Sequence, residues 1–266
     1  MKTSWQYSKH QTNYKVEFDL ELKSIRYSYV YQSTNQKYQS TYSIEDFLTG
    51  ISSNIPLKIE TKLMALVLQH IEEERLNENQ MHHYRFWKYL DRTKLPQAIR
   101  FKTIKIHEHW PDHFLELTPF GICHIHTKYD GTELSQNAQR LDHLFFQGPK
   151  EPLDLEHRLK IKELLLAALA PKAAFSTKDL FPLFDYTKIP IKRYEYSKDG
   201  GHSGHWWSLE SNHVSIGGWG RGGRDGGGHH TSIEAAWPKL NGLSGEFDKY
   251  RAEVMVFLKT AIISEH

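Results

Sequence analysis

Residues 14–23 alternate without exception between apolar and charged side chains. The apolar set is Tyr14, Val16, Phe18, Leu20 and Leu22, and the charged set is Lys15, Glu17, Asp19, Glu21 and Lys23. A period of two places successive side chains on opposite faces of a β-strand, so one face is buried and the other is solvated. Tyr27, Tyr29 and Tyr31 continue the pattern in a second strand. The N-terminal part is therefore predicted to form an amphipathic antiparallel sheet.

The predicted elements come in runs rather than in alternation. Strands are expected in the first 42 residues, helices at 44–48, 57–77 and 81–90, strands over 101–129, helices at 134–146 and 153–170, and strands again from 189. Strands grouped in this way pair antiparallel, so the predicted fold class is α+β, with mainly antiparallel sheets and packed helices. A Gly/Pro segment separates predicted parts 1–146 and 153–266. Whether these are two closely associated subdomains or one large domain stays open.

Composition excludes several classes of protein. The chain has 266 residues, 39% of them hydrophobic and 25% charged, with a formal net charge of +2, which is typical of a globular protein without a strong overall field. Cys123 is the single cysteine, so no intrachain disulfide can form. No apolar run approaches the roughly 20 residues that a membrane span needs. A cytoplasmic protein without a membrane partner is expected.

The segment 199–230 holds eleven of the 17 glycines and is the first candidate site. Its centre predicts a hairpin, because four apolar residues alternate around a turn at 211–212 and share one face. These residues are Trp207, Leu209, Val214 and Ile216. The flanking stretches 199–204 and 217–230 are expected to be loops that leave the hairpin at the same end. Glycine allows the backbone of such loops to approach a ligand closely.

The side chains of these loops suggest phosphate chemistry. Arg221 and Arg224 are predicted to bind phosphate and Trp219 to stack on a base. The residues predicted to act as acid, base or metal ligand are His202, His205, His229, His230 and Asp225. This pattern indicates an enzyme acting on a phosphate-bearing substrate, a nucleotide or nucleic acid, by hydrolysis that a metal could assist.

Two histidine pairs with one residue between them form a second candidate site. They are His107 with His109, and His124 with His126. Each pair lies on one face of its predicted strand, so neighbouring strands could present both to zinc or another divalent ion. Hydrogen-bonded or solvated histidines are the other interpretation, and both remain open.

A function of a different class also fits the sequence. No complete catalytic motif is present, and the many tyrosines and tryptophans are typical of protein interfaces. The chain could therefore be a noncatalytic inhibitor or immunity-type protein that binds a partner toxin. Sequence alone leaves the choice between an enzyme and a binding protein open.

Overall fold

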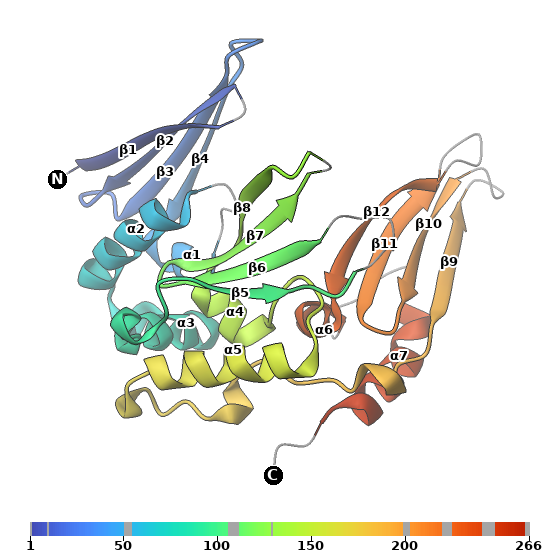
Figure 1. The fold of residues 1–266 in the computed structure, drawn as a ribbon. Coiled ribbons are helices and arrows are strands. Elements are labelled where there is room, and N and C mark those ends of the chain that lie inside the picture. The colour runs from blue at the N-terminus through green and yellow to red at the C-terminus, as the bar shows by residue number, and fades with distance from the viewer. Residues whose placement is uncertain are drawn as a thin grey trace. The chain divides into compact units, whose positions relative to one another are not determined.

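The structure is a computed structural model that describes residues 2–9, 11–50, 55–105, 112–128, 130–198, 203–219, 225–240 and 248–263. It contains three four-stranded antiparallel sheets and seven α-helices (Figure 1). The predicted α+β class with antiparallel sheets and packed helices is confirmed. The chain divides into two compact units. The first unit comprises Met1–Arg92 and Leu169–Ala173, and the second comprises Thr93–Ala168 and Ala174–His266.

The first unit is built on a sheet whose strands follow one another in chain order. The strands are β1 (Lys2–Lys9), β2 (Thr12–Asp19), β3 (Ser24–Tyr31) and β4 (Lys37–Ser43). The helices are α1 (Ile44–Leu48), α2 (Leu57–His70) and α3 (Glu78–Tyr89), with a 3-10 turn, η1 (Glu73–Arg75). The alternating pattern is confirmed for β2 and β3, because Val16, Phe18, Ile25 and Tyr27 are buried on one face.

The strand predicted over 14–23 is too long, because at Leu20–Lys23 the chain turns instead of continuing β2. The cause is the carboxylate of Asp19, which accepts hydrogen bonds from the amides of Glu21 at 3.2 Å and Leu22 at 3.4 Å. An aspartate that binds amides two and three residues ahead stabilises a turn in place of a strand. Leu22 is left exposed by this turn.

The predicted helix 57–77 ends early, at His70 of α2, and the predicted helix 81–90 is α3, which begins earlier, at Glu78. Asn77 caps the start of α3 in a capping box, in which the Asn77 side chain accepts from the Gln80 amide and the Gln80 side chain accepts from the Asn77 amide. Such a cap stabilises a new helix start because it satisfies amides that have no partner in the helix. The capping signal Asn77-x-x-Gln80 was present in the sequence.

The first sheet of the second unit follows strand order β5-β6-β7-β8. Its strands are β5 (Ile99–Lys102), β6 (His113–Thr118), β7 (Gly121–Thr127) and β8 (Glu133–Gln139). Helices α4 (Leu141–Gln147) and α5 (Leu155–Ala168) cover one face, where the Phe101 ring of β5 lies 5.4 Å from the His157 ring of α5 (Figure 1). β8 replaces the first half of the predicted helix 134–146, because this segment pairs along β7.

The second sheet of this unit follows strand order β12-β11-β10-β9. Its strands are β9 (Lys192–Lys198), β10 (Ser203–Leu209), β11 (His213–Trp219) and β12 (Asp225–Ser232). Helices α6 (Ile233–Leu240) and α7 (Asp248–Ala261) pack on one face, and 3-10 turns occur at η4 (Thr177–Asp179) and η5 (Tyr186–Lys188), while η3 (Pro171–Ala173) belongs to the first unit. The predicted hairpin is confirmed by the pairs Trp207–Ile216 and Leu209–Val214. Ile216 is exposed, whereas its three partners on this face are buried.

Two glycines of β11 allow close packing within this sheet. A Cβ on Gly217 would lie 2.6 Å from Cζ2 of Trp206, and one on Gly218 would lie 2.9 Å from the carbonyl oxygen of Gly204. Both distances are shorter than van der Waals contact allows. Residues 217–219 belong to β11 and residues 225–230 belong to β12. The prediction of a loop over 217–230 is therefore wrong for these residues.

A buried ion pair joins α5 to α6. Arg158 donates to the carboxylate of Glu234 and, at 2.9 Å, to the carbonyl of Phe184, while the Tyr186 hydroxyl donates to Glu234 at 2.7 Å. The side chains of Arg158 and Glu234 are 3% and 0% exposed. At the start of α6 the Ser232 hydroxyl accepts from the Ala235 amide at 3.2 Å.

Within the part of the chain that the structure describes, no helix is long and apolar enough to cross a membrane.

Candidate metal centre

Three histidines meet on the helix-covered face of the β5–β8 sheet. His113 begins β6 and pairs directly with His126 near the end of β7, and His124 lies two residues before His126 on the same face. Leu115, Leu117 and Ile122 form the buried part of that face. The three histidines therefore form a cluster at the end of the sheet that lies away from the β6–β7 turn.

The distance between two of these histidines suits a shared ion. The Nε2 atom of His124 lies 3.3 Å from the Nδ1 atom of His113. Two nitrogens bound at 2.0–2.1 Å to one tetrahedral zinc ion are separated by about 3.3 Å. The ring centroids of His113 and His124 are 5.0 Å apart, and the His126 centroid lies 5.8 and 6.0 Å from theirs. Imidazoles around one tetrahedral zinc have centroids about 5 Å apart, so His126 requires a small side-chain rotation to join.

Glu151 lies on the other side of the His124 ring. Its Oε1 atom is 3.8 Å from Nδ1 of His124, and both side chains are half-buried. A carboxylate at the second nitrogen of a metal-binding histidine fixes the ring orientation and makes the first nitrogen a stronger ligand. The arrangement gives His124 one nitrogen toward His113 and the other toward a carboxylate.

The segment 148–152 holds Glu151 in place through its neighbours on both sides. The Lys150 amide donates to the Gln139 side chain at 3.0 Å, and the Lys150 carbonyl accepts from the Ser232 amide at 2.6 Å. The Pro152 carbonyl accepts from the Ile104 amide at 2.9 Å. These bonds fix the segment against both sheets of the second unit.

Burial affects the protonation of this cluster. Desolvation lowers the pKa of His113, with the nearby His124 as the next cause, and desolvation also lowers the pKa of His124. Burial raises the pKa of Glu151, an effect that His113 and Lys150 oppose. Neutral imidazole is the form that binds metal, so a lowered histidine pKa favours the ligand form near neutral pH.

The structure brings together one pair of the four predicted metal ligands. His124 and His126 share a face as predicted. His107 and His109 lie outside the described residues. The sequence pattern did not single out His113, although Pro119 and the adjacent Gly121 favour a turn, and a turn centred on 119–120 pairs residue 113 with 126. Glu151 had no signal in the sequence, because tertiary hydrogen bonds position it.

The predicted phosphate site is only partly described. Arg221, Arg224 and His202 lie outside the described residues. Trp219 ends β11 and pairs with Asp225 at the start of β12, which brings these two predicted residues together in the backbone ladder.

The described histidines of that site divide between the two faces of the β9–β12 sheet. His205 and His229 are exposed on the face that carries Ile216, since His205 pairs with Gly218 and His229 pairs with Ile216. His230 lies on the opposite face, where its Nδ1 atom is 2.8 Å from the Ser215 hydroxyl. His205 and His229 can therefore act on one ligand, whereas His230 faces away from them.

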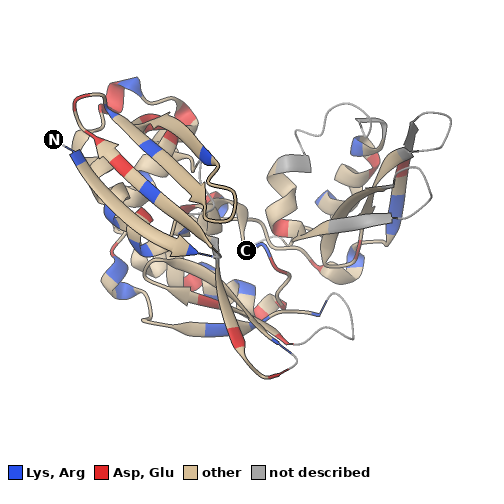
Figure 2. Ribbon diagram, turned by 90° about the horizontal axis from the view of Figure 1, so that it is seen from above, with Lys and Arg blue, Asp and Glu red and all other residues tan. Residues whose placement is uncertain are grey.

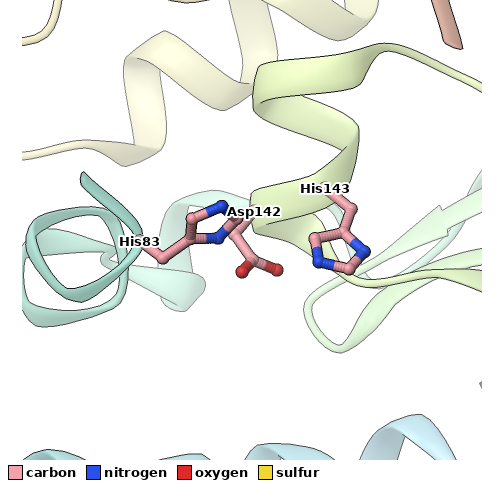
Figure 3. Close-up of side chains that lie close together, drawn as sticks. All are labelled: His83, Asp142 and His143. Atoms are coloured by element: carbon pink, nitrogen blue, oxygen red, sulfur yellow. The ribbon is translucent and has the colours of Figure 1, made fainter. Parts of the chain in front are cut away.

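Helix α4 carries a further acid and histidine side by side. Asp142 and His143 lie in its first turn (Figure 3). Asp142 accepts two hydrogen bonds from Arg140, at 3.0 and 2.8 Å, and both side chains of this ion pair are buried. Figure 3 also labels His83, a buried side chain on α3 of the first unit. The bidentate arginine neutralises the Asp142 carboxylate, which makes this ion pair part of the interior of the second unit.

No protein-family model matches this chain, and no curated protein or solved structure is similar enough to it to count as a match.

Proposed function

We propose that this protein is a metal-dependent hydrolase, in which His113, His124 and His126 bind one divalent ion such as zinc. The observation that carries the proposal is the 3.3 Å separation of two imidazole nitrogens from neighbouring strands, with a carboxylate behind one ring. Three histidine ligands leave one position of a tetrahedral ion for water. Glu151 is a positioning residue that orients His124.

The chemistry expected at such an ion is water activation. A bound zinc ion lowers the pKa of its water to about 7, so hydroxide forms at neutral pH and the released proton passes to solvent. The hydroxide oxygen would form a bond to an electrophilic phosphorus or carbon, the bond to the leaving oxygen would break, and that oxygen would take up a proton. The histidine cluster supports this class of reaction without defining the substrate.

A phosphate-bearing substrate, a nucleotide or nucleic acid, remains the proposed class. Its support is the sequence segment with Arg221 and Arg224, whose guanidinium groups suit phosphate, and the exposed pair His205 and His229 on the same unit. The substrate class and the metal centre are separate proposals, because the protein could bind the ion without acting on a phosphate-bearing substrate, or act on that substrate without the ion.

Replacing His124 by alanine should weaken zinc binding by at least roughly 100-fold, because it removes a ligand and leaves Glu151 without the ring that it orients. Glu151→Gln should weaken binding by about 10- to 100-fold, since the ligands stay and only their orientation is lost. Isothermal titration of untagged protein with zinc, and elemental analysis after purification, measure both effects.

The matched control is His157→Gln, which changes a half-buried histidine of α5 in the same unit and outside the cluster. It should bind zinc like the unchanged protein. Unchanged protein that binds zinc no more tightly than His124→Ala would overturn the metal centre. Tight zinc binding with no zinc-dependent hydrolysis of bis(4-nitrophenyl) phosphate would retain the centre and reject the phosphate substrate.

A further inference from the structure

Five tyrosines form an aromatic surface on the β1–β4 sheet of the first unit. We call this the tyrosine surface; its members are Tyr7, Tyr14, Tyr29, Tyr31 and Tyr38. Tyr7, Tyr14, Tyr29 and Tyr38 are paired in register, so they make one row across all four strands. Tyr31 extends the row along β3.

The tyrosine rings contact one another by stacking and by edge-to-face packing. The centroids of Tyr7 and Tyr14 are 4.9 Å apart and those of Tyr29 and Tyr38 are 5.0 Å apart, with both pairs stacked. The Tyr31 ring stands nearly perpendicular to those of Tyr29 and Tyr38, at 82° to each. These ring contacts order the row. Tyr31 and Tyr38 are nevertheless 40% and 46% exposed, so they offer aromatic surface to a ligand. Ordered aromatic rings lose little conformational entropy on binding.

The tyrosine surface lies at the end of the sheet away from its buried core. Val16, Phe18 and Ile25 fill the buried end, where the Phe18 ring stacks 6.0 Å from that of His70 in α2. Beyond that cover, the tyrosines occupy the same face. A surface that continues the core face but carries hydroxyl-bearing rings suits a ligand with flat apolar faces and polar edges.

The strand ends that carry this surface contain basic but no acidic residues. Residues 4–16 and 26–44 contain lysine and arginine but neither aspartate nor glutamate. Lys9 is exposed and lies on the tyrosine face two residues after Tyr7, whereas Lys37, which pairs with Val30, is exposed on the opposite face. The acidic residues of the four strands and their turns gather at the other end, as Glu17, Asp19 and Glu21 (Figure 2). The surface therefore complements an anionic ligand.

We propose that the tyrosine surface binds single-stranded nucleic acid, with bases stacking on Tyr31 and Tyr38 and the backbone lying along Lys9. Stacking on aromatic rings and contacts from cations to phosphates are the two elements of such binding, and neither requires a particular sequence. This proposal is independent of the metal centre, because all its residues belong to the first unit.

The test is fluorescence anisotropy with labelled single-stranded RNA and DNA 12-mers of mixed sequence. Tyr31→Ala and Tyr38→Ala should each weaken binding by about 5- to 150-fold, the usual effect of losing one stacking ring. Tyr31→Phe and Tyr38→Phe should bind like the unchanged protein, because the ring is kept. Lys9→Ala should lower the dependence of affinity on salt.

The matched control is Gln39→Ala, an exposed residue of β4 on the opposite face from Tyr38. It should leave binding unchanged. No binding by the unchanged protein, equal binding of duplex DNA, or equal loss in Gln39→Ala would each overturn the proposal. Binding of a protein or of a second copy of the chain through these tyrosines, without nucleic-acid binding, would also overturn it.

Discussion

Replacing Arg158 by methionine is expected to lower the free energy of unfolding of the second unit by about 3–5 kcal/mol. The variant leaves the carboxylate of Glu234 without its cation in a site where that side chain is 0% exposed. Removing one partner of a buried pair costs more than the pair contributes, because the remaining charge stays desolvated. Guanidinium unfolding followed by tryptophan fluorescence measures the loss.

The matched control lies two residues further along α5. Lys160 pairs with Glu163 at 2.8 Å, but the two side chains are exposed. Lys160→Met should therefore cost about 0–1 kcal/mol. The double variant Arg158→Met/Glu234→Leu should recover part of the lost stability, since no unpaired charge remains. If Arg158→Met unfolds at the same denaturant concentration as Lys160→Met, the buried pair does not have the role assigned to it.

The penalty of Arg158→Met should also depend on pH. Desolvation already raises the pKa of Glu234, and Arg158 opposes that rise. Without Arg158 the folded-state pKa rises further above the unfolded value, so the folded variant holds a proton that the unfolded chain releases. A raised folded pKa gives stability that is present below the unfolded pKa and is lost as pH rises. The difference from the unchanged protein should thus be smaller near pH 5 than near pH 8, measured by the same unfolding experiment.

Replacing Gly148 by alanine should cost about 2–5 kcal/mol, the sum of a left-handed backbone and an overlap of atoms. Gly148 ends α4 with φ at 78°, and its amide donates to the Leu144 carbonyl at 3.0 Å. A Cβ at this position would lie 2.7 Å from the Cβ of Glu234 and 2.9 Å from the Phe181 ring. Neither neighbour is free to move, because Phe181 is 0% exposed and Glu234 is held by Arg158. Thermal and denaturant unfolding measure the change.

Gly131→Ala separates the two contributions to that cost. Gly131 has φ at 82°, close to that of Gly148, but no atom lies within 4 Å of its added Cβ. Its replacement should cost only the backbone strain, about 1–2 kcal/mol. Equal losses for the two variants would show that the contacts of Gly148 with Phe181 and Glu234 contribute nothing.

Local sequence patterns predicted a helix or strand correctly where a single interaction determines its structure. The alternation around Val16 and Phe18 identified a strand because burial on one face sets its period. The same pattern misled at Leu20–Lys23, where the Asp19 carboxylate stabilises a turn. The helix predicted over 134–146 is wrong for Leu134–Gln139, because pairing with β7 makes these residues a strand. Glycines near Trp206 suggested a loop, but they allow the indole to pack against the strand.

The candidate metal centre was half predictable for a similar reason. The spacing of His124 and His126 fixes their common face, so sequence alone places them together. His113 requires the register of a hairpin, which follows from its turn. Glu151 depends on hydrogen bonds from Gln139, Ile104 and Ser232, whose positions no local pattern determines.

The segment 148–152 would link the binding of the proposed ion to the stability of the C-terminal sheet. Glu151 lies beside His124, while the adjacent Lys150 carbonyl holds the Ser232 amide at the end of β12. An ion that binds more tightly when this segment is in place would lower the population of openings that release Ser232. Because loss of Glu151 is expected to weaken binding by about 10- to 100-fold, such openings would become about 9- to 50-fold rarer at an ion concentration of 100 times Kd. Hydrogen exchange at the Ser232 amide would then report the occupancy of a site on the other sheet.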